Sequence, residues 1–181
     1  STSRRQRQMC IRDRVWMYNV FFTGMPVMCL STNATIYCEE SEKDDDEDID
    51  DILKWEGNVW LSDPYHTSTS FQITDCNWHK RGATTMNYEK AGYKLNLDHK
   101  KSFLGMRKDD DWILNALYDD EGLIHNKLSY QVWQEIASSN SVANDEGISM
   151  EYVELFVDQE YRGIYGLSER IDKKSASLSS H

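Results

Sequence analysis

The chain has 181 residues, of which 39% are hydrophobic and 12% aromatic, which is enough to build the core of one domain. Its formal net charge at pH 7 is −11, so acidic side chains dominate its surface. Such a surface repels phosphate backbones, which excludes nucleic acid as the expected partner.

Residues 1–14 differ in charge from the rest of the chain. They carry a net charge of +4, so the remaining residues carry −15. Within them, Gln8–Arg14 resembles the translation of a transposon end used in sequencing libraries, and we interpret residues 1–14 as such an artefact. A disordered basic tail, or an arm that binds acidic surfaces, is the alternative. Val15–Leu30 is apolar, but it is interrupted and too short to cross a membrane, so we expect an incoming strand and no membrane span.

Short runs of apolar, aromatic and β-branched residues predict strands in the first half of the chain, at 25–30, 55–61 and 70–74, with a further sheet region from His79. Residues 39–51 are almost entirely acidic and are expected to form a solvated loop. This loop lacks the central glycine of an EF-hand, so we assign no calcium site to it.

The second half of the chain predicts one helix between strands. Residues 93–97 alternate like a half-buried strand, and 112–114 continue the core after a turn at 109–111. The helix is expected at 123–137, where Leu128, Val132 and Ile136 recur every four residues and predict a buried apolar face. Residues 152–157 and 161–167 predict a hairpin, with Asp158-Gln159 forming a less favourable or longer turn than Asn-Gly would.

The cysteines and histidines show no metal-binding spacing. Cys10, Cys29, Cys38 and Cys76 form no C-x-x-C pair, and no H-x-x-x-H pair occurs. We expect buried or partly buried free thiols, with a Cys29–Cys38 disulfide as the alternative.

Several sequence blocks together resemble a known family. Lys101–Asp120 reads K-S-F-L-G-M-R-K-D-D-D-W-I-L-N-A-L-Y-D-D, and Leu123–Leu128 reads L-I-H-N-K-L. Both resemble the central signature of the spore-coat CotH kinase family. Further similar blocks follow the family's order, at residues 81–85, 88–97, 152–156 and 160–171. The resemblance covers Met25 to Lys174.

The resemblance implies an α+β fold. It would be a mixed or antiparallel sheet with one main helix, resembling the smaller lobe of an atypical protein-kinase-like fold, and incomplete. Residues 15–174 would be the N-terminal part of the kinase domain, and 175–181 a truncated tail. The family's catalytic and magnesium-binding aspartates lie downstream of the block at 169–171, so the fragment is expected to be inactive by itself.

The resemblance also implies the chemistry of the parent protein. With ATP and magnesium, it would transfer phosphate to serine or threonine of protein substrates at a spore coat or cell surface. Its partners would be that substrate and the missing C-terminal half of its own domain. The alternative is a non-catalytic structural or adhesion module at the same location.

Five residues are the expected site. In a kinase-like fold a lysine contacts the nucleotide phosphates and a helical glutamate holds that lysine. Lys90 and Lys94 are the expected lysines and Glu135 the glutamate, although a surface lysine and a solvated helix acid are the simpler interpretations. Arg81 and Gly82 are expected to form a phosphate-facing loop, because glycine lets backbone amides approach an anion.

Two further features bear on this site. Ala91 stands where the family has a second lysine, and its presence would weaken nucleotide binding if that lysine is the phosphate ligand. Asp109–Asp111 could hold magnesium, but three adjacent acids more often form a solvated turn, so we assign no metal ligand.

Overall fold

The computed structural model describes residues 5–11, 14–20, 24–38, 52–65, 70–82, 84–139 and 147–171. The expected acidic loop at 39–51 lies outside the described residues, and so does the tail at 175–181.

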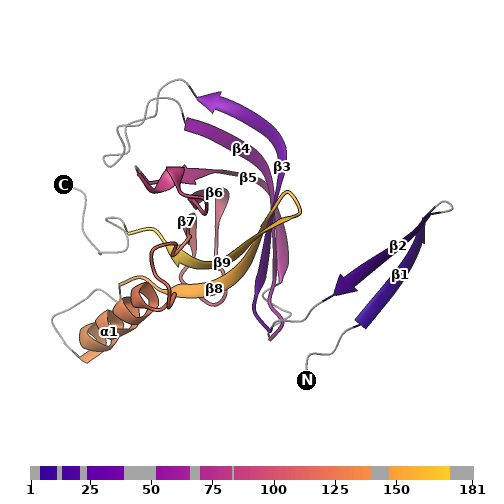
Figure 1. Cartoon of the computed structure of the whole chain (residues 1–181). Helices are drawn as coiled ribbons and strands as arrows, with labels where there is room; N and C mark the ends of the chain where they lie inside the picture. The colour runs from indigo at the N-terminus through magenta and orange to yellow at the C-terminus, as the bar shows by residue number, and fades with distance from the viewer. Residues whose placement is uncertain are drawn as a thin grey trace.

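Seven strands form a closed barrel (Figure 1). Their order around the barrel is β3-β4-β5-β6-β7-β9-β8, and the closing pair, β3 and β8, is parallel while the other neighbours are antiparallel. The strands are β3 (Val27–Cys38), β4 (Ile52–Ser62), β5 (Phe71–Arg81), β6 (Gly92–Lys101), β7 (Asp109–Asn115), β8 (Met150–Val157) and β9 (Glu160–Glu169).

Alternation along the strands fills the interior of the barrel. On β6, Tyr93, Leu95 and Leu97 are buried in the core, whereas the residues between them are only half-buried. The largest fully buried side chains include Trp78, Trp112 and Tyr165, which come from β5, β7 and β9. The period of two therefore places one face of each strand inside, as the sequence predicts.

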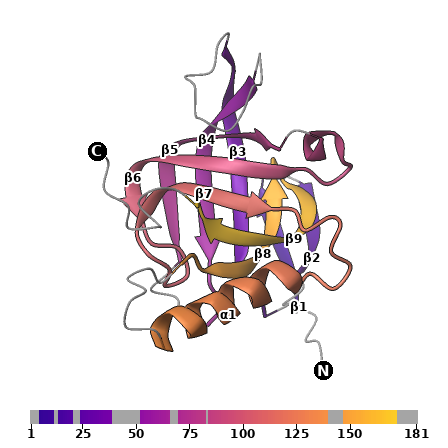
Figure 2. The ribbon, with the colours of Figure 1, turned by 90° about the vertical axis from the view of Figure 1, so that its left-hand side faces the viewer.

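One helix, α1 (His125–Ser139), follows β7 and lies outside the barrel beside β8 (Figures 1 and 2). The fold is therefore α+β, mostly sheet with a single helix in the described part of the chain. This confirms the predicted fold class and is consistent with the smaller lobe of a kinase.

The first two strands form a separate sheet. β1 (Arg5–Ile11) and β2 (Arg14–Val20) pair as an antiparallel hairpin that lies apart from the barrel (Figure 1). The apolar run expected as one incoming strand thus holds both β2 and the start of β3. Gly24, with φ +76°, and Pro26 lie immediately before β3. The origin of residues 1–14 stays a prediction.

One local expectation was wrong, and one alternative is excluded. Residues 109–111 are the start of β7 and not a solvated turn, because the Asp109 carboxylate is buried and accepts the N–H of Asp110 at 2.8 Å. The Cys29–Cys38 disulfide is not formed, since Cys29 is a free thiol, as is the buried Cys76. The free-thiol expectation is thereby confirmed for these two cysteines.

Candidate nucleotide-binding groove

The connection between β5 and β6 begins with a turn that requires glycine. Gly82 follows the last residue of β5, Arg81, and has φ +103°. A Cβ atom at Gly82 would lie 2.0 Å from Oγ1 of Thr85. The chain then forms the short 3-10 helix η2 (Thr85–Asn87), in which Tyr88 N–H donates to the Thr85 carbonyl at 3.2 Å. A side chain at position 82 would therefore force this loop open.

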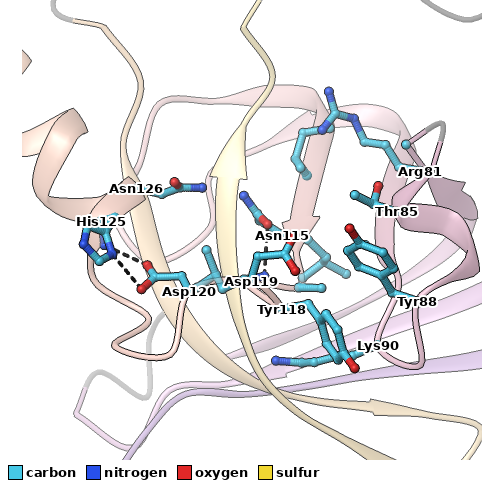
Figure 3. Close-up of a pocket in the computed structure, with 16 residues that line it drawn as sticks. Arg81, Thr85, Tyr88, Lys90, Asn115, Tyr118, Asp119, Asp120, His125 and Asn126 are labelled. Carbon is cyan, nitrogen blue, oxygen red and sulfur yellow. Dashed lines mark hydrogen bonds and ion pairs between the residues drawn. The ribbon is translucent and has the colours of Figure 1, made fainter.

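A cavity of about 400 Å³, which we name the loop cavity, lies beneath this connection (Figure 3). Its volume falls within the range of small-molecule sites. Three of the five expected site residues, Arg81, Gly82 and Lys90, line it. The other lining residues are Thr85, Tyr88, Gly92, Ile113, Leu114, Asn115, Ala116, Leu117, Tyr118, Asp119, Asp120, His125 and Asn126.

Asp120, one of the two acidic residues that line the loop cavity, caps the start of α1. Asp120 accepts the backbone N–H of His125 at 2.8 Å and contacts the His125 ring nitrogen at 2.7 Å (Figure 3). Partial desolvation raises the pKa of Asp120, but the hydrogen bonds from His125 and Gly122 outweigh it and lower the pKa overall. The carboxylate is therefore held ionised at the start of α1, where it complements the helix dipole.

A second cavity, of about 320 Å³, lies next to α1, and we name it the helix cavity. Lys94 lines it, as does Tyr130 from α1. It shares Arg81, Ile113 and Asn115 with the loop cavity, so the two cavities adjoin, and we call them together the groove. The remaining lining residues are Ile148, Ser168, Glu169, Arg170 and Ile171.

Comparison with protein families identifies the family of this chain. A family model described as CotH kinase protein matches residues 79–179, more than half of the chain. The chain belongs to the CotH kinase family. The match spans both cavities and α1, and it confirms the predicted resemblance. No curated protein matches the chain.

The CotH block at 88–97 carries both expected lysines, and they lie in different parts of the groove. Lys94 is half-buried on the outer face of β6 and lines the helix cavity. Lys90 precedes β6, and its Nζ donates to the carbonyl of Ile164 on β9 at 2.6 Å. Burial lowers the pKa of Lys90. Arg81 lines both cavities and therefore lies between the two lysines.

Ala91, which is expected to stand where the family has a second lysine, does not line the groove. It is 4% exposed and lines a third cavity of about 570 Å³, the mouth cavity, whose wall it shares with Lys90 and Tyr118. A longer side chain at position 91 would enter the mouth cavity. The alanine therefore removes no side chain from the two cavities of the groove.

The docked face of α1 differs from the predicted one. Leu128, Val132 and Ile136 are 53%, 45% and 54% exposed, so the expectation that they form the buried face was wrong. Ala137 is buried instead, and Gln134 donates to the Ile148 carbonyl at 3.1 Å. The strands fill the barrel core by themselves, so the helix packs through a small and polar face.

Glu135 lies on the exposed side of α1. It lines neither the loop cavity nor the helix cavity. Its pairing with Lys90 or Lys94 stays a prediction.

Sequence reasoning missed a pair of buried acids that come from two different blocks of the CotH resemblance. Glu169 and Asp109 are each 2% exposed, and the guanidinium of Arg107 lies between them, 3.2 Å from Asp109 and 3.7 Å from Glu169. Burial raises the pKa of both carboxyls. Both residues stood in the quoted blocks, but nothing in their spacing indicated that they meet.

Neither a metal cluster nor a membrane-spanning helix occurs in the described residues. Within the ranges given above, no three histidine, cysteine, aspartate or glutamate side chains are placed to hold a metal ion. No helix in the described part of the chain is long and apolar enough to span a membrane.

Proposed function

We propose that this chain binds ATP in the groove and contributes the nucleotide-binding lobe of a CotH-type protein kinase. The parent protein would transfer the γ-phosphate to serine or threonine hydroxyls of protein substrates. The observation that supports the proposal is the position of Arg81, which lines both the cavity beneath the glycine turn and the adjoining cavity that Lys94 lines.

The phosphates fit the part of the groove near the glycine turn. Arg81 supplies positive charge there, and Lys94 adds a second positive charge in the adjoining helix cavity, on a chain whose net charge is −11. Charge-assisted hydrogen bonds to phosphate are among the strongest available to side chains. The turn at Gly82 brings backbone close to the cavity, as in other anion-binding loops.

The base fits the helix cavity. Ile113, Ile148 and Ile171 supply apolar walls, and Tyr130 adds an aromatic ring. These apolar and aromatic side chains can contact a purine, whose polar edge could meet Ser168, and Arg81, Lys94, Glu169 and Arg170 line the same cavity. The nucleotide would then lie along the groove, with its base near α1 and its phosphates under the glycine turn.

Magnesium is implied by the family, but the described residues do not form a site for it. Asp119 and Asp120 are the two acids of the loop cavity, and Asp120 is engaged by His125 and Gly122. When present with ATP, magnesium neutralises charge that develops on the transferred phosphate.

Glu135 keeps its proposed role as the partner of a nucleotide-binding lysine. Because its side chain is exposed here, the role requires α1 to turn toward the groove. Protein kinases control activity through the position of the corresponding helix, so such a movement is consistent with the proposal.

Nucleotide binding by this chain tests the proposal directly. Arg81→Ala and Lys94→Ala should each weaken ATP binding about tenfold or more in calorimetric titration, since each removes a charge-assisted contact. Lys100→Ala is the matched control, because Lys100 is an exposed lysine at the other end of β6. If ATP does not bind, or if all three variants bind equally, the groove is not the nucleotide site.

Phosphate transfer is tested in a protein that holds the complete kinase domain. Lys94→Ala is expected to abolish radiolabel transfer from ATP, and Lys90→Ala is expected to reduce it. Unchanged transfer in both would remove the two lysines from the proposed site.

A non-catalytic structural module at a spore coat or cell surface is the second candidate. The exposed apolar side chains of α1 favour it, because patches of this kind often mark contact surfaces between proteins. Absence of ATP binding would favour this candidate over the kinase.

A further inference from the structure

The connection over the loop cavity is tied to β9, which is not a neighbour of β6. Lys90 extends from this connection to β9, where its Nζ donates to the Ile164 carbonyl at 2.6 Å. The same ammonium lies 4.7 Å from the centroid of the Tyr165 ring. β6 and β9 are not neighbours in the barrel, because β7 lies between them. The contacts of Lys90 therefore span a strand.

Two more contacts hold the same connection. The hydroxyl of Tyr165 donates to the carbonyl of Ala91 at 2.9 Å. The Tyr165 side chain therefore contacts two consecutive residues, Lys90 and Ala91. The ring of Tyr88 packs against that of Tyr118, with centroids 5.0 Å apart. Tyr165 is 1% exposed and belongs to the rigid core, which makes it a firm anchor.

The ammonium of Lys90 is already engaged without a nucleotide. A charged donor to a carbonyl and a cation over an aromatic face are both favourable contacts, and partial burial strengthens them. To bind a phosphate instead, Lys90 would have to leave both. Arg81 and Lys94 line the groove without needing these contacts to break.

We infer that Lys90 is a positioning residue, which holds residues 84–91 over the loop cavity through Ile164 and Tyr165 before nucleotide arrives. The phosphates are then bound by Arg81, Lys94 and the glycine turn. This inference rests on the proposed function for its consequence, but the anchoring itself does not require ATP. A loop held in place in advance lowers the entropy cost of binding.

Hydrogen exchange of the nucleotide-free chain tests the anchor. The amides of Asn87 and Tyr88 donate within the 3-10 turn, so their exchange reports opening of the loop. Lys90→Met should speed their exchange about tenfold, whereas amides of β8 should exchange as in the unaltered chain. Unchanged exchange at Asn87 and Tyr88 would overturn the inference.

Two matched variants separate anchoring from a general loss of charge. Lys90→Arg keeps a cation with hydrogen-bond donors, so the amides of Asn87 and Tyr88 should exchange within about threefold of their rate in the unaltered chain. Lys80→Met removes an exposed lysine of β5 and should change nothing at Asn87 and Tyr88. Faster exchange with Lys80→Met would show that charge and not anchoring controls the loop, and would overturn the inference.

Tyr165→Phe extends the test to nucleotide binding. Tyr165 does not line the loop cavity, so its hydroxyl can affect ATP only through the loop. If ATP binds, this variant should weaken it about threefold. Unchanged affinity with Tyr165→Phe, together with a large loss with Lys90→Met, would make Lys90 a phosphate ligand and overturn the inference. If ATP does not bind at all, the proposed function fails while the exchange result still decides the anchor.

Discussion

Arg107 and Glu169 are 62 positions apart in sequence and meet at the end of β9. The backbone N–H of Arg107 donates to Oε1 of Glu169 at 2.9 Å, and the Arg107 Nε atom lies 3.7 Å from the same oxygen. The second carboxylate oxygen accepts the Ser149 N–H at 3.1 Å. The buried side chain of Glu169, the last residue of β9, thus connects that strand to two other segments. One precedes β7 and the other precedes β8.

This arrangement predicts a pH dependence of stability. Burial raises the pKa of Glu169 in the folded state, so the folded chain binds the proton more tightly than the unfolded chain. The resulting stabilisation is present below the ordinary glutamate pKa and is lost as pH rises through the raised pKa. Denaturant unfolding measured from about pH 4 upward should therefore show a loss of stability that is smaller in Glu169→Gln, by a total of about 1.4 kcal/mol for each unit by which the pKa is raised. Parallel curves for the two proteins would contradict this.

The hairpin between β8 and β9 predicts a stabilising substitution. Its two turn residues, Asp158 and Gln159, have φ of 50° and 70°, a conformation that glycine adopts without strain. Gln159→Gly should raise the free energy of unfolding by about 0.5 to 1 kcal/mol in thermal or denaturant melts.

Asp158→Gly is the matched control for the hairpin. The Asp158 carboxylate accepts from the backbone N–H and the hydroxyl of Thr32, at 2.6 and 2.8 Å. Losing these bonds should make this variant less stable than the original chain by about 1 kcal/mol. Equal stabilisation by both glycines would show that the contacts to Thr32 contribute nothing.

Gly57, on β4 of the barrel, is a position where adding a side chain should strongly reduce stability. A Cβ atom there would lie 2.0 Å from the Ser31 carbonyl oxygen and 2.9 Å from the Trp78 ring. Because backbone and a core ring cannot both move aside, Gly57→Ala should cost about 3 kcal/mol of stability. Gly122→Ala, whose nearest neighbour would be 3.4 Å away, should change stability by less than about 0.5 kcal/mol. Similar melting curves for the two variants would rule out the close approach at Gly57.

Substitutions on the exposed and the buried side of α1 should differ in their effect on stability. Leu128→Gln and Ile136→Gln should each change the free energy of unfolding by less than about 0.5 kcal/mol, because both side chains are about half exposed. Ala137→Gln should destabilise the chain by about 1 to 3 kcal/mol, because Ala137 is 5% exposed against the barrel. A large loss with Leu128→Gln and none with Ala137→Gln would restore the helix face predicted from the sequence.

Local sequence signals predicted most of the elements. Every predicted barrel strand overlaps a described strand, although β3, β4 and β5 extend well beyond the predicted runs. The helix predicted at 123–137 begins two residues later and ends two residues later. Alternation and turn residues are local properties, so they locate elements without indicating which strands are neighbours.

The groove was only partly predictable. The motif around Arg81 and Gly82 and the lysines of the next block indicate a phosphate site through their residue types and order along the chain. The engagement of Lys90 by β9 was not predictable, because its partner Ile164 lies 74 positions away, with Tyr165 next to it, and neither carries a sequence signal of that contact.

By itself, the sequence determined the family, the α+β composition and the inward face of the strands, because motifs and short-range periodicity are encoded in neighbouring residues. Only the tertiary structure decided that the barrel closes through β3 and β8, that α1 docks through Ala137 and not Leu128, and that Arg107 meets two buried acids. These are contacts between distant segments. They depend on which surfaces remain free once the strands have filled the core, and no local pattern specifies that.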